Sequence, residues 1–202
     1  MFTGQMSKTL IYVAGPTGIG KTSLSIELAK RLKTEVISCD SRQFYKELKI
    51  GTSPPSDEQL REVNHHFIHN KSILDDYSVG DYEKESINIS TKLFKKRDYL
   101  ILVGGSGLYA DSILFGIDDI PKVPLEIKDK LNLKFNEKGI VYLQEKLKEI
   151  DLEYYNKVDL ENPSRLIRAI GVYKASGKKI SSLWKNNKKE RIFNSLIITM
   201  KS

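Results

Sequence analysis

A glycine-rich stretch near the amino terminus, residues 15–22 (GPTGIGKT), constrains this chain more than any other feature. It follows the apolar run 10–14 and precedes the helical pattern 23–32, which predicts a strand, a loop and a helix in that order. The spacing G-x-x-x-x-G-K-[ST] is that of the phosphate-binding P-loop. We therefore expect an α/β fold, a P-loop NTPase-like parallel sheet flanked by helices.

The residue types of this loop explain why it would hold a di- or triphosphate. Its glycines allow the backbone to curl so that successive N–H groups point inward, while the lysine adds a mobile positive charge. The threonine hydroxyl lies where a Mg²⁺ ion bound to phosphate would sit, so Thr22 is the predicted metal ligand. The predicted phosphate-binding residues are Gly15, Pro16, Thr17, Gly18, Ile19, Gly20, Lys21 and Thr22.

A carboxylate follows the next predicted strand. Residues 35–39 form a short apolar run typical of a parallel strand, and Asp40 comes directly after it. Ligands of open α/β sheets bind beyond the carboxyl ends of the strands, so Asp40 and the P-loop are expected to face one crevice. Position leaves three roles open for Asp40: a Mg²⁺ ligand, a general base, or a cap of the following turn.

The third predicted strand, residues 99–103, ends in Gly104-Gly105. Many P-loop ATPases and GTPases have a Mg²⁺-binding aspartate at this kind of position. Two glycines instead leave room for close approach of backbone or substrate. This difference argues against an ATP-driven motor or switch.

The carboxyl-terminal half differs from the preceding residues in its composition and in its hydrophobic pattern. Lysine-rich helical patterns at 125–135, 139–149, 163–175 and 181–186 precede a strand pattern at 195–199. We therefore expect a core at 8–116, a helical insertion at 117–190 and a returning strand within 191–202. The net charge of +7 hints at a polyanionic partner, although a lysine-rich composition without one remains an alternative.

Two cationic features of this half suit a nucleic acid. Residues 178–191 carry six cations and one acid around Trp184, a combination that suits RNA phosphates and a stacked base; a solvated face is the alternative. Arg165 and Arg168 share one face of a helix predicted to begin near Pro163, where their guanidinium groups could hold phosphate or simply lie on the surface.

Other features narrow the class of protein. His65, His66 and His69 lack the second ligand set of a zinc site, so we expect an edge strand with solvated imidazoles. The single Cys39 excludes an internal disulfide and fits a reducing cytoplasm. No apolar run is long enough for a membrane span, and no signal peptide is recognisable; Met6 is a candidate natural start. We expect a cytoplasmic monomer.

Taken together, these motifs resemble those of the tRNA dimethylallyltransferases. Residues 15–22 match the family pattern G-P-T-x-x-G-K-T, and residues 38–45 with 50–52 are similar to S-x-D-S-x-Q-x-Y…I-G-T. Residues 104–109 are similar to G-G-T-x-x-Y, with serine at position 106. Residues 162–178 resemble D-P-x-R-x-x-R-A-L-E-V-Y…T-G-K, with Asn162 and Gly171 in place of acidic residues.

The resemblance implies a transfer reaction. A dimethylallyl group would move from dimethylallyl diphosphate to N6 of the adenosine 3′-adjacent to the anticodon of tRNA, releasing diphosphate. Asp40 would be the general base, and Thr22, Mg²⁺, Arg165 and Arg168 would complete the catalytic set. The insertion would grip the anticodon stem-loop. The residues implied to contact tRNA are Asp40, Ser41, Arg42, Gln43, Ser106, Lys128, Ser164, Arg165, Leu166, Ile167 and Arg168.

Several alternatives stay open. Members of this family usually continue past the strand near residue 199 into further helices, whereas this sequence stops at Ser202: a fragment, a chain completed by a partner, or a reduced enzyme would each fit. An adenylate isopentenyltransferase acting on free AMP, a small-molecule kinase and an RNA-binding remnant without activity are the competing functions.

Overall fold

The computed structural model describes residues 8–185 and 188–201. The chain divides into two compact units. One unit contains the chain up to residue 117 together with the chain from residue 188, and the other spans residues 118–187. The sequence prediction placed these boundaries at 117 and 190.

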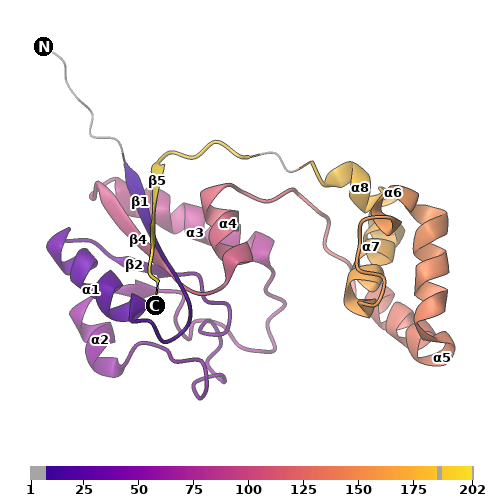
Figure 1. The fold of residues 1–202 in the computed structure, drawn as a ribbon, viewed down its shortest axis with the longest axis horizontal. Helices are drawn as coiled ribbons and strands as arrows, with labels where there is room; N and C mark the ends of the chain where they lie inside the picture. Colours follow the sequence, from indigo (N-terminus) through magenta and orange to yellow (C-terminus); the bar gives the residue numbers. More distant parts are fainter. Residues whose placement is uncertain (1–7, 186–187, 202) are drawn as a thin grey trace, which may run out of the picture. The chain divides into compact units, whose positions relative to one another are not determined.

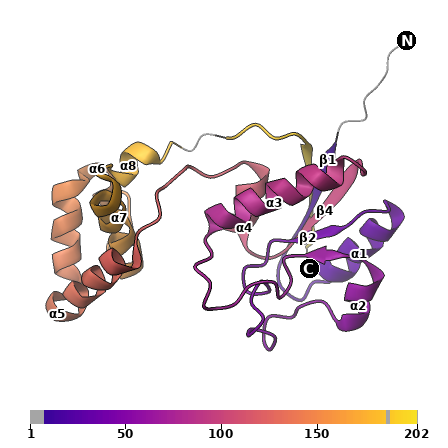
Figure 2. The ribbon, with the colours of Figure 1, turned by 180° about the vertical axis from the view of Figure 1, so that it is seen from behind.

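The first unit is built on a five-stranded, fully parallel sheet with strand order β3-β2-β4-β1-β5, which Figures 1 and 2 show from its two sides. Its strands are β1 (Thr9–Ala14), β2 (Val36–Ser38), β3 (His65–His66), β4 (Tyr99–Val103) and β5 (Asn194–Thr199). Its helices are α1 (Lys21–Arg31), α2 (Asp57–Glu62), α3 (Val79–Phe94) and α4 (Gly107–Leu114). The predicted α/β fold is confirmed.

Alternating side chains bury both faces of this sheet. Leu10 of β1 packs in a cluster with Tyr82 of α3 and Ile113 of α4. Its neighbour Ile11 points to the opposite face and packs in a second cluster with Ile26 of α1. A sheet covered on both faces accounts for the nearly continuous apolar runs of β1 and β4.

Parallel strands also bring their carboxyl ends to one edge of the sheet. β1 leads into the P-loop, β2 into Asp40 and β4 into Gly104, and β4 pairs with both β1 and β2. Three loops that lie far apart in the sequence therefore begin on neighbouring strands.

The second unit is helical and has its own core. It contains α5 (Leu125–Ile150), α6 (Leu152–Tyr155), α7 (Pro163–Ser176) and α8 (Ile180–Leu183). α5 is interrupted at Gly139, where φ is 73°, so the two separate helical patterns predicted on either side of this glycine are confirmed. Leu143 and Leu147 of α5 pack against Leu166 and Ile170 of α7.

The prediction for the three histidines was partly wrong. The expected solvated imidazoles are partly buried: His66 Nε2 bonds Glu35 Oε2 at 2.7 Å, and Nε2 of His65 and of His69 are buried without a hydrogen-bond partner among the described residues. His65 and His66 do form the edge strand β3.

Within residues 8–185 and 188–201, no helix combines the length and apolar character needed to cross a bilayer. The same residues contain no group of three or more His, Cys, Asp or Glu side chains placed to hold a metal ion.

Candidate active site at the carboxyl edge of the sheet

The P-loop has the conformation that its glycines predict. Gly18 and Gly20 have φ values of 83° and 92°, in the left-handed region that favours glycine. Gly20 is the N-cap residue of α1 and, within the described part of the chain, makes no side-chain capping bond, since glycine has no side chain to accept from the first-turn N–H groups. Lys21 Nζ donates to the carbonyl oxygens of Gly15 at 2.9 Å and Pro16 at 2.6 Å.

Asp40 uses its two carboxylate oxygens differently. Oδ1 accepts a hydrogen bond of 3.2 Å from the N–H of Arg42, which is the capping role that the sequence left open. Oδ2 faces the loop after β4: a Cβ atom on Gly105 would lie 3.7 Å from it and 4.0 Å from Thr17 Oγ1. Asp40 therefore caps its own turn and still presents an oxygen toward the P-loop.

The two glycines after β4 make this convergence possible. A Cβ atom on Gly104 would lie 2.6 Å from both Asp40 N and Cys39 C, closer than atoms approach without displacement. Only glycine lets the ends of β2 and β4 come this close. Ser106 follows these two glycines. Its hydroxyl accepts a hydrogen bond of 3.1 Å from the N–H of Ser41 and shares a second hydrogen bond, also of 3.1 Å, with the hydroxyl of Ser41.

Gln43, predicted to contact tRNA, has its side-chain amide engaged within the protein. Its Oε1 accepts from Ser38 Oγ at 3.3 Å, and its Nε2 donates to the carbonyls of Thr52 at 3.1 Å and Ser53 at 3.0 Å. The adjacent Phe44 is fully buried among Phe67, Tyr82 and other rings. These contacts fix the loop that carries Asp40.

Two groups beneath the strand ends, the partly buried Tyr12 and the buried Cys39, were not singled out in the sequence. Tyr12 OH donates to Gly104 O at 3.4 Å, and burial raises the pKa of Tyr12 to about 12, so this hydroxyl stays a neutral donor. Burial also raises the pKa of the neighbouring Cys39 thiol, which makes it a poor nucleophile. The alternation of side chains along β1 could have predicted that Tyr12 lies on an inner face of the sheet. It could not have predicted that Gly104 O is its hydrogen-bond partner.

The second unit carries the arginine pair on the exposed face of α7. Asn162 caps this helix by accepting from Arg165 N at 3.3 Å, and Arg165 and Arg168 are both exposed. Between them, Leu166 is fully buried and Ile167 is 6% exposed in the helical core. These two side chains therefore anchor the face that carries the arginines, and a tRNA contact by residues 166 and 167 stays a prediction. Ser164 and Lys128 are exposed.

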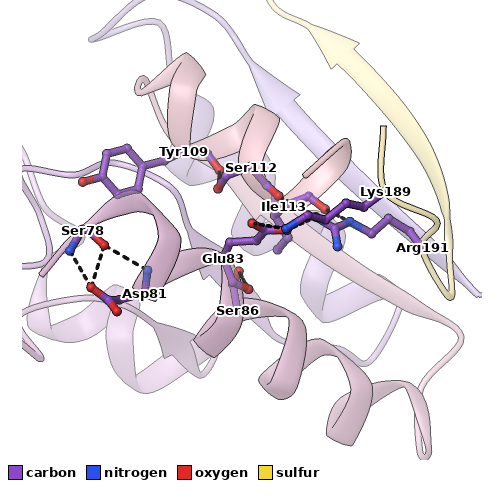
Figure 3. A network of polar contacts seen from close by, with 9 residues as sticks. All are labelled: Ser78, Asp81, Glu83, Ser86, Tyr109, Ser112, Ile113, Lys189 and Arg191. Atoms are coloured by element: carbon purple, nitrogen blue, oxygen red, sulfur yellow. Dashed lines mark hydrogen bonds and ion pairs between the residues drawn. The ribbon is translucent and has the colours of Figure 1, made fainter. Parts of the chain in front are cut away.

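The basic stretch 178–191 is not a uniform cationic surface. Figure 3 shows two of its cations turned to the buried Glu83 of α3: Arg191 approaches Oε1 at 2.7 Å and Lys189 approaches Oε2 at 3.3 Å. Arg191 also donates to the carbonyls of Ser112 and Ile113 at the end of α4. Lys189 and Arg191 therefore contact the protein where the chain re-enters the sheet, and RNA binding by the basic stretch stays a prediction. Trp184 is half-exposed and lies against Tyr154 within the second unit, and Asn186 and Asn187 lie outside the described residues.

This chain is similar to known proteins over most of its length. The family model described as IPP transferase matches residues 43–202. The chain is 50% identical over 199 residues to a tRNA dimethylallyltransferase of Flavobacterium psychrophilum, covering 96% of this chain and 65% of the relative. It is 45% identical over 192 residues to tRNA dimethylallyltransferase 1 of Bacteroides fragilis, with coverages of 95% and 64%.

Solved structures are also similar to this chain. A eukaryotic dimethylallyltransferase acting on tRNA is similar with a TM-score of 0.75 and 26% identity, covering 96% of this chain and 48% of that one. A tRNA isopentenylpyrophosphate transferase from Bacillus halodurans is similar with a TM-score of 0.56 and 31% identity, covering 96% and 61%. The chain spans about 65% of the length of the curated relatives it matches.

Proposed function

This chain belongs to the IPP transferase family, and we propose that it transfers a dimethylallyl group from dimethylallyl diphosphate to N6 of an adenine in tRNA. The target is the adenosine 3′-adjacent to the anticodon, and the second product is diphosphate. The observation that carries this proposal is the convergence at Gly105: Oδ2 of Asp40 and Oγ1 of the P-loop residue Thr17 lie within 4.0 Å of the position that a Cβ atom on Gly105 would take. A base and a cradle for a leaving group thus follow β2 and β1, the two strands that pair with β4.

The phosphate-binding loop supports the departure of the leaving group. In the transfer, a bond forms between N6 and the first carbon of the allyl group as the bond from that carbon to diphosphate oxygen breaks. The departing oxygens accumulate negative charge. Lys21 and the uncapped first-turn amides of α1 are donors that can neutralise this charge. Arg165 and Arg168 are proposed to add charge from the second unit.

Asp40 is the proposed general base. The lone pair of the adenine amine is delocalised into the ring, so the amine is a weak nucleophile until it loses a proton. In this proposal the proton leaves N6 for the carboxylate of Asp40. Because Oδ1 is occupied by the N–H of Arg42, Oδ2 is the oxygen that would accept it.

The donor set suits a magnesium ion. Mg²⁺ takes oxygen ligands, keeps several waters and uses few protein groups when phosphates supply the rest. The proposed protein ligand is the hydroxyl of Thr22, in the first turn of α1. Bound with the substrate, the ion would neutralise charge on the diphosphate.

RNA recognition is proposed for the exposed cations of the second unit. Arg165, Arg168 and Lys128 are exposed and suit phosphate contacts. Ser41, Arg42 and Ser106 lie in the loops beside Asp40 and are proposed to contact the RNA near the target base. For Gln43 we propose an indirect role, since its amide holds the Asp40 loop.

The decisive experiment supplies every candidate substrate to the full chain. The protein is incubated with Mg²⁺, dimethylallyl diphosphate and either an anticodon stem-loop or AMP, and the nucleosides are analysed by mass spectrometry. The proposal predicts prenylated adenosine only with the RNA. Prenylation of AMP alone would support a cytokinin-type activity. Transfer of the γ-phosphate from ATP, measured in parallel, would indicate a kinase. RNA binding without transfer in any arm would indicate a non-catalytic protein.

A further inference from the structure

The residue that follows the last strand lies directly against the phosphate-binding loop. Met200 comes immediately after β5, and its N–H donates to Ala14 O at 2.9 Å, one step beyond the paired residues Ala14 and Thr199. Ala14 is the last residue before the P-loop. The ladder between β1 and β5 therefore ends where the loop begins.

Met200 meets the loop at both of its ends. A Cβ atom on Gly15, the first glycine, would lie 2.9 Å from Met200 O and 3.3 Å from Met200 Cβ. A Cβ atom on Gly20, the last glycine, would lie 4.0 Å from the terminal methyl carbon, Cε, of Met200. One residue thus spans the base of the loop, with its backbone at one end and its side chain at the other.

The side chain of Met200 is itself held in place. It is partly buried and packs against the cluster on the α1 face of the sheet that contains Ile11, Val13 and Ile26. A methionine side chain is unbranched and fills irregular gaps, which suits the space under a curled loop. The contact therefore connects the loop to the core.

A loop of this kind needs such external support. Three of its first six residues are glycines, which lack side chains to pack and lose more conformational freedom on ordering than other residues. Affinity for an anion depends on how well the amides are already oriented before binding. A side chain that fills the base of the loop reduces the number of conformations that the amides can adopt.

We infer that Met200 is a positioning residue for the phosphate-binding loop and raises its affinity for diphosphate. The inference rests on the proposed function, since it takes residues 15–22 as the diphosphate site. It adds that this site is built from both ends of the chain, because the strand that returns from the helical unit supports the loop near the amino terminus. Sequence spacing within the P-loop motif carries no sign of this dependence.

The test measures binding rather than turnover. Inorganic diphosphate with Mg²⁺ is titrated calorimetrically into the full chain, as wild type and as Met200→Ala, Met200→Leu and Ile197→Ala. Ile197 lies within β5 and is 49% exposed. It is adjacent to Ile198, whose side chain packs with Met200 on the other face, so truncation of Ile197 is the matched control. We expect Met200→Ala to weaken binding about tenfold, and Met200→Leu and Ile197→Ala to stay near wild type.

The outcomes separate the two ideas. A wild type that binds no diphosphate overturns both the proposed function and this inference. A wild type that binds, with Met200→Ala binding equally well, overturns the inference only. If Met200→Ala fails to fold, Met200→Val is used, because valine still places an apolar group on the sheet but lacks the methyl that reaches toward Gly20. Binding by Met200→Val at the wild-type level would then overturn the inference.

Discussion

Asp40 offers the sharpest single-residue test of the proposed chemistry. Asp40→Asn keeps an oxygen that can accept from Arg42 N, so the turn should survive, but the amide cannot take the N6 proton. We expect the rate of prenyl transfer to fall about 100-fold or more. Calorimetric affinity for diphosphate should change little. An unchanged transfer rate would remove Asp40 from the role of base.

Gly104 tests how tightly the strand ends are packed. In Gly104→Ala the new methyl would lie 2.6 Å from the backbone of residues 39 and 40, and backbone atoms cannot swing away as a flexible side chain can. We expect a loss of about 3 kcal/mol in the free energy of unfolding, measured by urea titration. Gly105→Ala is the matched control, since its methyl would meet nothing closer than 3.7 Å. Equal stability of the two variants would contradict the packing described here.

A buried ion pair connects Glu83 of α3 to Arg191, in the segment that leads into β5. Glu83 and Arg191 have side chains only 7% and 11% exposed. Glu83→Gln would leave the buried guanidinium without its charge partner, which costs about 3–5 kcal/mol in comparable cases. Glu27→Gln, which breaks the exposed pair of Glu27 and Arg31, should cost less than about 1 kcal/mol. Thermal unfolding of both variants checks the difference.

The edge strand β3 gives the unit a pH dependence. His65 Nδ1 lies 2.8 Å from Val63 O and must donate to it, so the buried Nε2 carries no proton; this nitrogen has no hydrogen-bond partner among residues 8–185 and 188–201. Burial lowers the pKa of His65 below its ordinary value of 6.5. The unfolded chain therefore binds a proton more readily, and stability should decrease as the pH falls below about 6.5. His65→Asn should flatten this part of a melting-temperature profile; an unaltered profile would exclude His65 as the cause.

Helices and strands were mostly predictable because their signals are local. The apolar runs of β1 and β4, and the two patterns separated by Gly139, are readable within a few residues. α6 was missed because it has only four residues and depends on Asp151, which caps it and also holds Ser181, thirty residues away. Contacts over such separations leave no local pattern.

The same difference between local signals and distant contacts explains which parts of the candidate site were predicted. The P-loop and Asp40 were predicted because each is a motif next to a strand, and parallel pairing brings strand ends together. The contacts that Gln43 and Arg191 make within the protein were not predicted, because their partners, Ser53 and Glu83, lie elsewhere in the sequence. A polar side chain in a motif looks the same in the sequence whether it serves a ligand or the protein.

The net charge of +7, summed over the whole sequence, favours electrostatic attraction of an RNA. Arg165 and Arg168 are exposed, whereas the residues between them are buried, so truncating both should leave the helical core intact. If each guanidinium neutralises one phosphate, the double variant Arg165→Ala, Arg168→Ala should bind a stem-loop more weakly. Its slope of log affinity against log salt should also be shallower, by about 1.4 to 1.8.

The control must remove the same charge from elsewhere. Arg31 and Arg61 are exposed on α1 and α2 of the first unit, so Arg31→Ala with Arg61→Ala also lowers the net charge to +5. Filter binding over a series of salt concentrations compares the two double variants. A general attraction to positive charge would change both slopes alike, because each double variant removes two positive charges. A specific contact through α7 predicts that the slope changes only when Arg165 and Arg168 are removed, and equal changes would contradict it.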